Sequence, residues 1–158
     1  MSLEAALENA NASVRDLVES IGSEARVDVA SIPGGALGWA ISEAAKARPE
    51  QRFVFVAPNL DEAYRHEANL RFLLGGANGE VLLYAAADTS PLVDVVPDRR
   101  SEMQRMAVLD RLAERLPWHV LIVPASALVR RVPPRVHLES GIVTVELGQR
   151  IERDSFVR

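Results

Sequence analysis

Apolar residues in this chain recur at a helical spacing in some blocks and form short continuous runs in others. Apolar residues about 3.6 positions apart predict helices over residues 4–20, 37–45, 60–74 and 101–116. Short β-branched and aromatic runs predict strands at residues 27–30, 53–57, 81–84, 119–123 and 142–147. One helical turn is also predicted at 125–129, and a further helix beginning at 151. The predicted order is one helix followed by alternating strands and helices.

Start signals precede two of these helices. Asn59, followed three residues later by Glu62, forms a capping box, and Gly75 ends that helix. Ser101 with Gln104 gives the same signal for the helix before Pro117. The side chains of that helix expected to face the core are Met103, Met106, Leu109, Leu112 or Ala113, and Leu116.

Alternating strands and helices of these lengths predict βα units and a mostly parallel sheet. Residues 53–57 are continuously apolar, as in strands that are buried on both faces, so an α/β fold of three layers is expected. Such sheets bind ligands beyond the carboxyl ends of their strands. Residues 85–98, which contain Pro91 and Pro97, are either a functional loop at that edge or a plain crossover connection.

Composition limits the class of protein. The chain has 158 residues, 48% of them apolar and 25% charged, which fits one globular domain and at most part of a second. It contains no cysteine, so disulfides, thiolate metal sites and cysteine nucleophiles are excluded. No apolar run approaches the roughly 20 residues of a membrane span, and the polar N-terminus lacks a signal-peptide core. We therefore expect a cytoplasmic protein with no membrane partner.

Charge is unevenly distributed along the chain. The net charge is −4, but residues 126–158 carry six arginines against four acids, a net of +2. Arg130, Arg131 and Arg135 in this part form either an arginine face for an acidic or phosphate partner or a solvated edge. Lys46 is the only lysine, so chemistry that needs a lysine ammonium has one candidate.

The glycine-rich segment before residue 37 lies where a phosphate-binding loop would follow the first predicted strand. A working loop requires the pattern G-x-x-x-x-G-K-[ST]. Laid on residues 31–38, the lysine position holds Leu37 and the hydroxyl position holds Gly38, so hydrolysis of ATP is not expected. The residues of this degenerate loop are Ser31, Pro33, Gly34, Gly35, Ala36, Leu37 and Gly38. We predict that Gly35 serves a tight turn and that Gly35→Ala is destabilising.

Other candidate catalytic and metal-binding patterns are weak. Asp61 and Glu62 resemble an acidic magnesium box, but they fall at the start of a helix, where acids favour the helix dipole. The histidines His66, His119 and His137 lack metal-ligand spacing and are expected to be surface or structural residues. No G-x-S-x-G elbow occurs. We predict no catalytic residue and no metal site.

Several segments together resemble the N-terminal, UvrB-like region of bacterial transcription-repair coupling factor (Mfd). The segments that carry this resemblance are residues 32–37, 54–59, 101–112, 120–128, 131–134 and 146–150. The aromatic-rich W-E-T-L-P-Y loop of the family is replaced here by residues 87–92, Ala-Asp-Thr-Ser-Pro-Leu. The resemblance covers residues 25–158, and the order of the segments is more specific than any one of them.

The resemblance implies a degenerate RecA-like, P-loop NTPase-like domain of the UvrB domain 1a type. It implies the degenerate domain over residues 25–140 and the start of a UvrA-binding second domain over 141–158. The helical spacing near the N-terminus adds a helical extension over residues 1–24. In the family, an ATP-driven DNA translocase displaces stalled RNA polymerase and recruits UvrA for nucleotide excision repair. The motor domains, which use ATP and magnesium and contact DNA and polymerase, lie downstream of this region.

For the chain itself, the resemblance implies a non-catalytic scaffold without a cofactor. UvrA binding is expected for the completed module and is expected to be weak or absent for residues 1–158, with Arg150 as the candidate contact. Two other hypotheses stay open. One is a small nucleotide-binding or ATPase domain that uses the loop at Gly34 and Gly35, and the other is a free-standing α/β adaptor domain.

Overall fold

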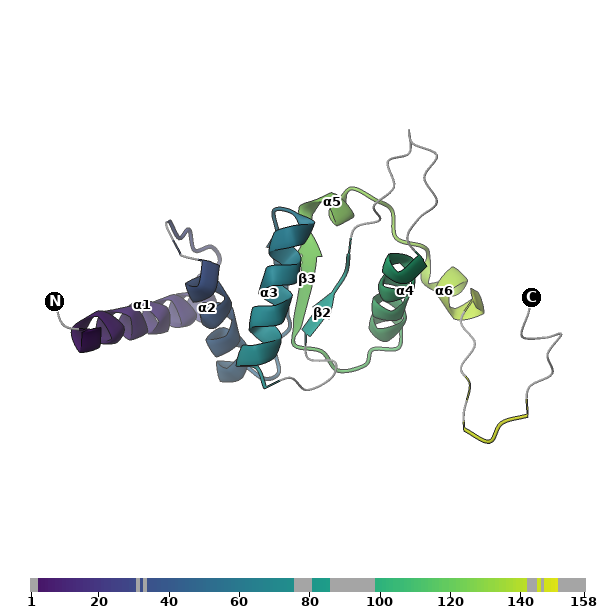
Figure 1. Ribbon diagram of the computed structural model, residues 1–158, viewed down its shortest axis with the longest axis horizontal. Helices are drawn as coiled ribbons and strands as arrows, with labels where there is room; N and C mark the ends of the chain where they lie inside the picture. Colours follow the sequence, from purple (N-terminus) through teal and green to yellow (C-terminus); the bar gives the residue numbers. More distant parts are fainter. Residues whose placement is uncertain are drawn as a thin grey trace.

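The computed structural model describes residues 3–30, 32, 34–75, 81–85, 99–141, 145 and 147–150 (Figure 1). Its helices are α1 (Leu3–Ser23), α2 (Gly34–Ala47), α3 (Leu60–Leu73), α4 (Arg99–Ala113), α5 (Ala125–Leu128) and α6 (Arg135–Gly141). Its strands are β1 (Phe53–Ala57), β2 (Val81–Leu83) and β3 (Val120–Pro124). The predicted α/β class is confirmed.

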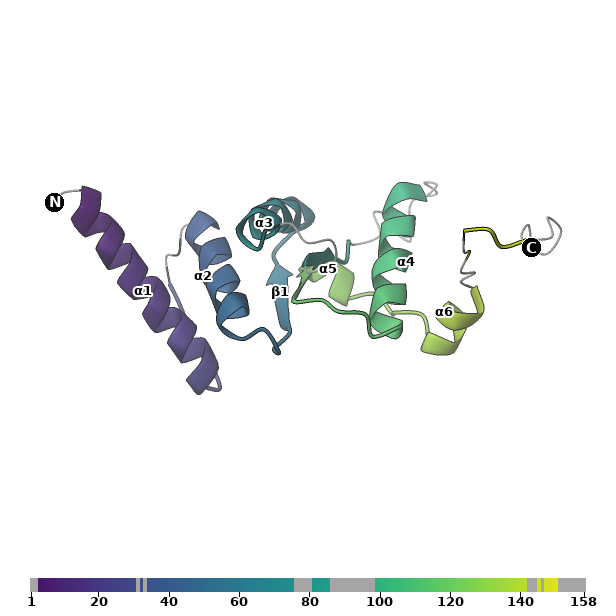
Figure 2. The ribbon, with the colours of Figure 1, turned by 90° about the horizontal axis from the view of Figure 1, so that it is seen from below.

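The three strands form one parallel sheet in the order β1-β3-β2, so β3 is central. Val120 of β3 is the register partner of both Phe53 on β1 and Val81 on β2, so all three strands are aligned at their starts. Figure 2 shows α1 and α2 at one end of the molecule and α4 and α6 at the other, with the sheet between them. The prediction of parallel strands joined by helical crossovers is therefore correct for these elements.

Apolar side chains pack on both faces of the sheet. One core joins α2, α3 and the sheet through Ala45, Ala57, Ala63, Leu70, Val81, Leu83, Val120 and Ile122. The other joins α4, α5, α6 and the sheet through Leu82, Tyr84, Val108, Leu109, Val123, Ala127 and Leu138. Burial on both faces is the usual arrangement for a parallel sheet, and it gives the three layers that the sequence predicts.

The predicted first strand is absent. Residues 26–30 are described throughout and have no strand structure. The run is interrupted by Asp28, which pairs with Arg26 at 3.0 Å, and Val29 is 50% exposed. A strand inside a parallel sheet would have to bury the Asp28 carboxylate, which is costly without a buried partner.

Because residues 26–30 do not join the sheet, β1 is an edge strand in the described part of the chain. Its Phe53 and Phe55 pack on the α3 side. Val54 and Val56, which point to the other side, are 59% and 47% exposed. The prediction that this strand is buried on both faces is wrong.

Helix α3 begins as predicted. The Asn59 side chain accepts a hydrogen bond of 2.9 Å from the Glu62 amide, and Asn59 itself has extended backbone. At the other end, Gly75 adopts a positive φ of 84°, which favours glycine. The Asn59 N-cap and the glycine stop are both confirmed.

Helix α4 differs from the prediction at its start and on its buried face. It begins at Arg99, so Ser101 lies inside the first turn and is not the N-cap. Val108 and Leu109 face the core, whereas Met103 and Met106 are 65% and 40% exposed. Of the predicted face, Leu109 and Leu112 do pack in the core, whereas both methionines and Leu116 are exposed. The helical period is therefore right, and packing against the sheet selects the residues that are buried.

The C-terminal part contains a helix that was not predicted. The Pro134 carbonyl accepts hydrogen bonds from the amides of His137 and Leu138 at the start of α6. Of the predicted strand at 142–147, residues 142–144 and 146 lie outside the described residues, and Val145 is exposed. Residues 86–98 of the predicted loop at 85–98 and the helix from 151 also lie outside them. No helix among the described residues is both long and apolar enough to cross a membrane.

Candidate functional site

The degenerate phosphate loop is the first candidate site. Helix α2 begins at Gly34, so Gly34 and Gly35 belong to its first turn, while Ser31 and Pro33 lie outside the described residues. Residues 26–30, which come before this segment, do not form a strand. The helix start is therefore not mounted on the carboxyl edge of the sheet, where α/β proteins place phosphate sites.

Leu37 and Gly38 stand at the lysine and hydroxyl positions of the motif. Leu37 is partly buried. Gly38 is buried against α3: a Cβ built on it would lie 3.6 Å from Asn69 Cβ and 3.9 Å from His66 Nδ1. A methyl group at position 38 would therefore be in ordinary van der Waals contact with α3.

Gly35 does not have the role that the sequence suggested. A Cβ built there meets no atom within 4 Å, and the φ of Gly35 lies outside the left-handed region. The residue is simply part of a helix. The prediction that a tight turn requires glycine at this position is wrong, because Gly35 lies inside α2 and has no positive φ.

His66 is buried, which agrees with the structural alternative expected for it and not with the surface one. It is 5% exposed, and its ring lies edge-on to Phe55 with centroids 4.7 Å apart. Its Nε2 lies 4.0 Å from a Glu62 carboxylate oxygen, and its Nδ1 is buried with no hydrogen-bond partner among the described residues. The spacing of Ala63, His66 and Leu70 on the buried face of α3 was a signal in the sequence that we did not use.

The acidic residues that resembled a magnesium box lie on α3. Asp61 and Glu62 occupy the first turn, where they favour the helix dipole, and Glu62 pairs with Arg65 at 2.9 Å. The described residues contain no group of three or more potential metal ligands. His119 makes a structural contact, with Nε2 2.9 Å from the carbonyl oxygen of Pro49.

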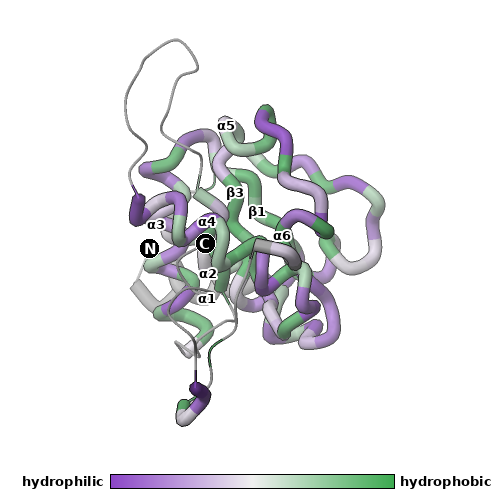
Figure 3. Tube along the Cα trace, turned by 90° about the vertical axis from the view of Figure 1, so that its right-hand side faces the viewer, coloured by the Kyte–Doolittle hydropathy of each residue, from purple (hydrophilic) through white to green (hydrophobic). Residues whose placement is uncertain are grey.

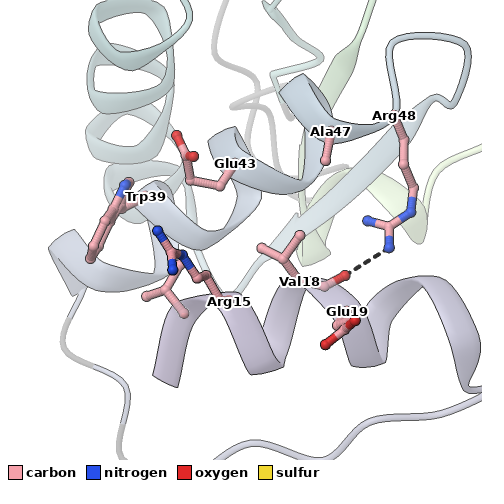
Figure 4. A pocket seen from close by; sticks show the side chains of 8 residues that line it. Arg15, Val18, Glu19, Trp39, Glu43, Ala47 and Arg48 are labelled. Atoms are coloured by element: carbon pink, nitrogen blue, oxygen red, sulfur yellow. Dashed lines mark hydrogen bonds between the residues drawn. The ribbon is translucent and has the colours of Figure 1, made fainter. Parts of the chain in front are cut away.

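A cleft of about 520 Å³ lies between α1 and α2 (Figure 4). Arg15 and Glu19 from α1 and Trp39 and Glu43 from α2 line it, so its charges are mixed. At one end the Arg48 side chain reaches across and donates a hydrogen bond of 2.8 Å to the Val18 carbonyl. This cleft was not identified from the sequence.

The Arg48 contact depends on a glycine of α1. A Cβ on Gly22 would overlap the Arg48 guanidinium. Arg48 Nη1 is also buried and has no hydrogen-bond partner among the described residues. Packing explains this end of the cleft: Arg48, which follows α2 directly, lies over Gly22 and holds α1 in place.

A second groove, of about 440 Å³, lies over β3 between α4, α5 and α6. Its walls are mainly apolar and include Leu109, Leu121, Val123 and Leu138. Tyr84 also lines it, with its hydroxyl accepting a hydrogen bond of 3.0 Å from Arg105. Arg130 and Arg135 are among the lining residues as well. This arrangement suits an apolar ligand or segment that carries negative charge.

Arg150, the candidate contact for UvrA, is exposed and follows a turn at Leu147–Gly148. It lines neither the α1–α2 cleft nor the groove over β3. The structure thus places the predicted loop residues and Arg150 in separate regions. The sequence analysis named only the arginines of this groove and the α4 residues Leu109, Leu112 and Ala113, and its other residues were found from packing.

The described residues define an α/β protein built on a parallel sheet of three strands. Comparison with known proteins found no matching family model, no matching curated protein and no matching solved structure.

Proposed function

We propose that this chain is the non-catalytic, UvrB-like docking module of a transcription-repair coupling factor. The observation that carries the proposal is the start of α2. Leu37 and Gly38 stand where a phosphate loop needs lysine and a hydroxyl, and Gly38 is packed against α3. The side chains of this region serve helix packing, as expected of a relic of a RecA-like domain.

The order of the segments that resemble the family also supports the proposal. Residues 54–59 contain the end of β1 and the cap of α3, and residues 120–128 contain β3 and α5. These segments lie on the parallel strands β1 and β3, which are direct neighbours in the sheet. On this proposal the protein works in the cytoplasm, in nucleotide excision repair at stalled RNA polymerase.

UvrA is the proposed partner of the completed module, through a second domain that begins near residue 141 with Arg150 at the contact. The test compares two immobilised chains, residues 1–158 and a chain extended through the second domain, by biolayer interferometry with purified UvrA. We expect the extended chain to bind and the shorter one to bind weakly or not at all. Equal binding of both would contradict the assignment of the contact to the second domain.

Catalysis is tested separately with ATP and magnesium. On the proposal, calorimetric titration of residues 1–158 gives no binding in the micromolar range and no release of phosphate. Micromolar binding that is lost in Gly35→Asp would instead support the nucleotide-binding hypothesis, because the added carboxylate would repel phosphate at the helix start.

A further inference from the structure

The exposed side of β1 and the groove over β3 form one apolar surface, which we call the β1–α6 surface. Val54 is the register partner of Leu121, and Val56 is the partner of Val123. Residues paired in this way point to the same side of a parallel sheet. Since Leu121 and Val123 line the groove, the exposed valines of β1 extend it across the edge strand.

This side of the sheet is covered incompletely by the described residues. Helices α4 and α6 pack over β2 and β3 through Val108, Leu109 and Leu138. Over β1 the valines stay 59% and 47% exposed. Figure 3 shows the hydrophobic stretches of β1 and β3 bordered by α5 and α6. Parallel sheets normally carry helices on both faces, so the exposed side of β1 is a place where a further helix can pack.

Arginines and further apolar residues border the same surface. Leu128, Val129 and Val132 are 60%, 85% and 51% exposed. Arg130 and Arg135 line the groove, and Arg131 is exposed between them. The whole chain has a net charge of −4, so a basic border is a local feature rather than a general one.

We propose that the β1–α6 surface binds an amphipathic helix of a partner protein, with carboxylates beside its apolar stripe. The apolar stripe covers Val54 and Val56 and enters the groove, and the carboxylates face the arginines. An apolar helix face laid in a groove is a common mode of peptide recognition. This inference rests on the proposed function as a docking module and names the chemistry of a partner segment.

The test uses two synthetic 18-residue helical peptides with the same leucine stripe, one flanked by Glu and the other by Lys. Fluorescence anisotropy with the full chain is expected to show at least tenfold tighter binding of the Glu peptide. Val56→Asp is expected to weaken that binding at least tenfold, and Arg131→Glu to reduce the preference for the Glu peptide. The matched control is Phe72→Asp, because Phe72 is 85% exposed on α3, which packs on the other side of the sheet.

Equal binding of the two peptides, no binding of either, or the same affinity for Val56→Asp and Phe72→Asp would overturn the inference. So would a dimer in sedimentation velocity that Val56→Asp dissociates, since the occupant would then be a second copy. UvrA binding separates this inference from the proposed function. If the extended chain did not bind UvrA but the full chain still bound the Glu peptide, only the proposed function would be refuted. If the extended chain bound UvrA but the peptide did not bind, only this inference would be refuted.

Discussion

Gly38 and His66 lie face to face where α2 crosses α3. His66 Nδ1 is buried without a partner among the described residues, and a Cβ on Gly38 would lie 3.9 Å from it. We predict that Gly38→Ser is about 1 kcal/mol more stable than Gly38→Ala, because the hydroxyl can donate a hydrogen bond to this nitrogen. Serine is otherwise the poorer helix former. Equilibrium unfolding in urea measures the difference.

Gly35 provides the matched control for that comparison, since a Cβ there has no neighbour within 4 Å. Gly35→Ala is expected to raise the free energy of unfolding by up to about 1 kcal/mol through helix propensity alone. The free energy of unfolding of Gly35→Ser is expected to be no higher than that of Gly35→Ala. A Gly38→Ser chain less stable than Gly38→Ala would show that the hydroxyl does not reach His66.

At the scale of elements, α1 is attached to α2 through Arg48 and Gly22. Gly22→Ala brings the new methyl group into the Arg48 guanidinium, so the hydrogen bond to Val18 should be lost. We predict that Gly22→Ala is neutral or destabilising in the natural chain. With Arg48→Met it should stabilise by up to about 1 kcal/mol, because only the gain in helix propensity remains. A double-mutant cycle in urea measures this coupling, and strict additivity would contradict the contact.

The edge position of β1 gives a second prediction at this scale. Val54 is 59% exposed, whereas Val120 on the neighbouring strand is 0% exposed. Val54→Thr should change the free energy of unfolding by less than about 0.5 kcal/mol, as for most surface substitutions. The same change at Val120 should cost about 1 to 3 kcal/mol, because it buries a hydroxyl. If Val54→Thr and Val120→Thr lowered the free energy of unfolding by similar amounts, in thermal or urea unfolding, β1 would be covered on both faces.

Elements with local signals were predicted well from the sequence. The Asn59 cap of α3 is an example, because its signal lies within four residues. The errors concern features that depend on distant parts of the chain. The segment 26–30 had a strand-like run but no place in the sheet, and the buried face of α4 was set by its contacts with β2 and β3. The contact between His66 on α3 and Phe55 on β1 was not predicted for the same reason.

At the scale of the whole molecule, the two sides of the sheet are used differently. The side of α2 and α3 is filled by packing that includes the buried Gly38, and the start of α2 belongs to this packing. The other side carries the groove and the exposed valines of β1. The surface proposed for a partner and the segment compared with a phosphate loop therefore lie in different parts of the fold.

This separation predicts that restoring the motif will not restore hydrolysis. We expect Leu37→Lys with Gly38→Thr to release no phosphate from ATP and magnesium. Hydrolysis also needs a loop fixed at the carboxyl end of a strand and carboxylates that hold the metal ion and orient water. Residues 26–30 form no strand, and Asp61 and Glu62 lie within α3.

A phosphate-release assay tests the double variant, with circular dichroism to verify folding. Since Gly38→Thr can disturb the contact with α3, the single variant Leu37→Lys is assayed for ATP binding in parallel. Turnover by the double variant, or micromolar ATP binding by Leu37→Lys, would show that the start of α2 retains a working phosphate site.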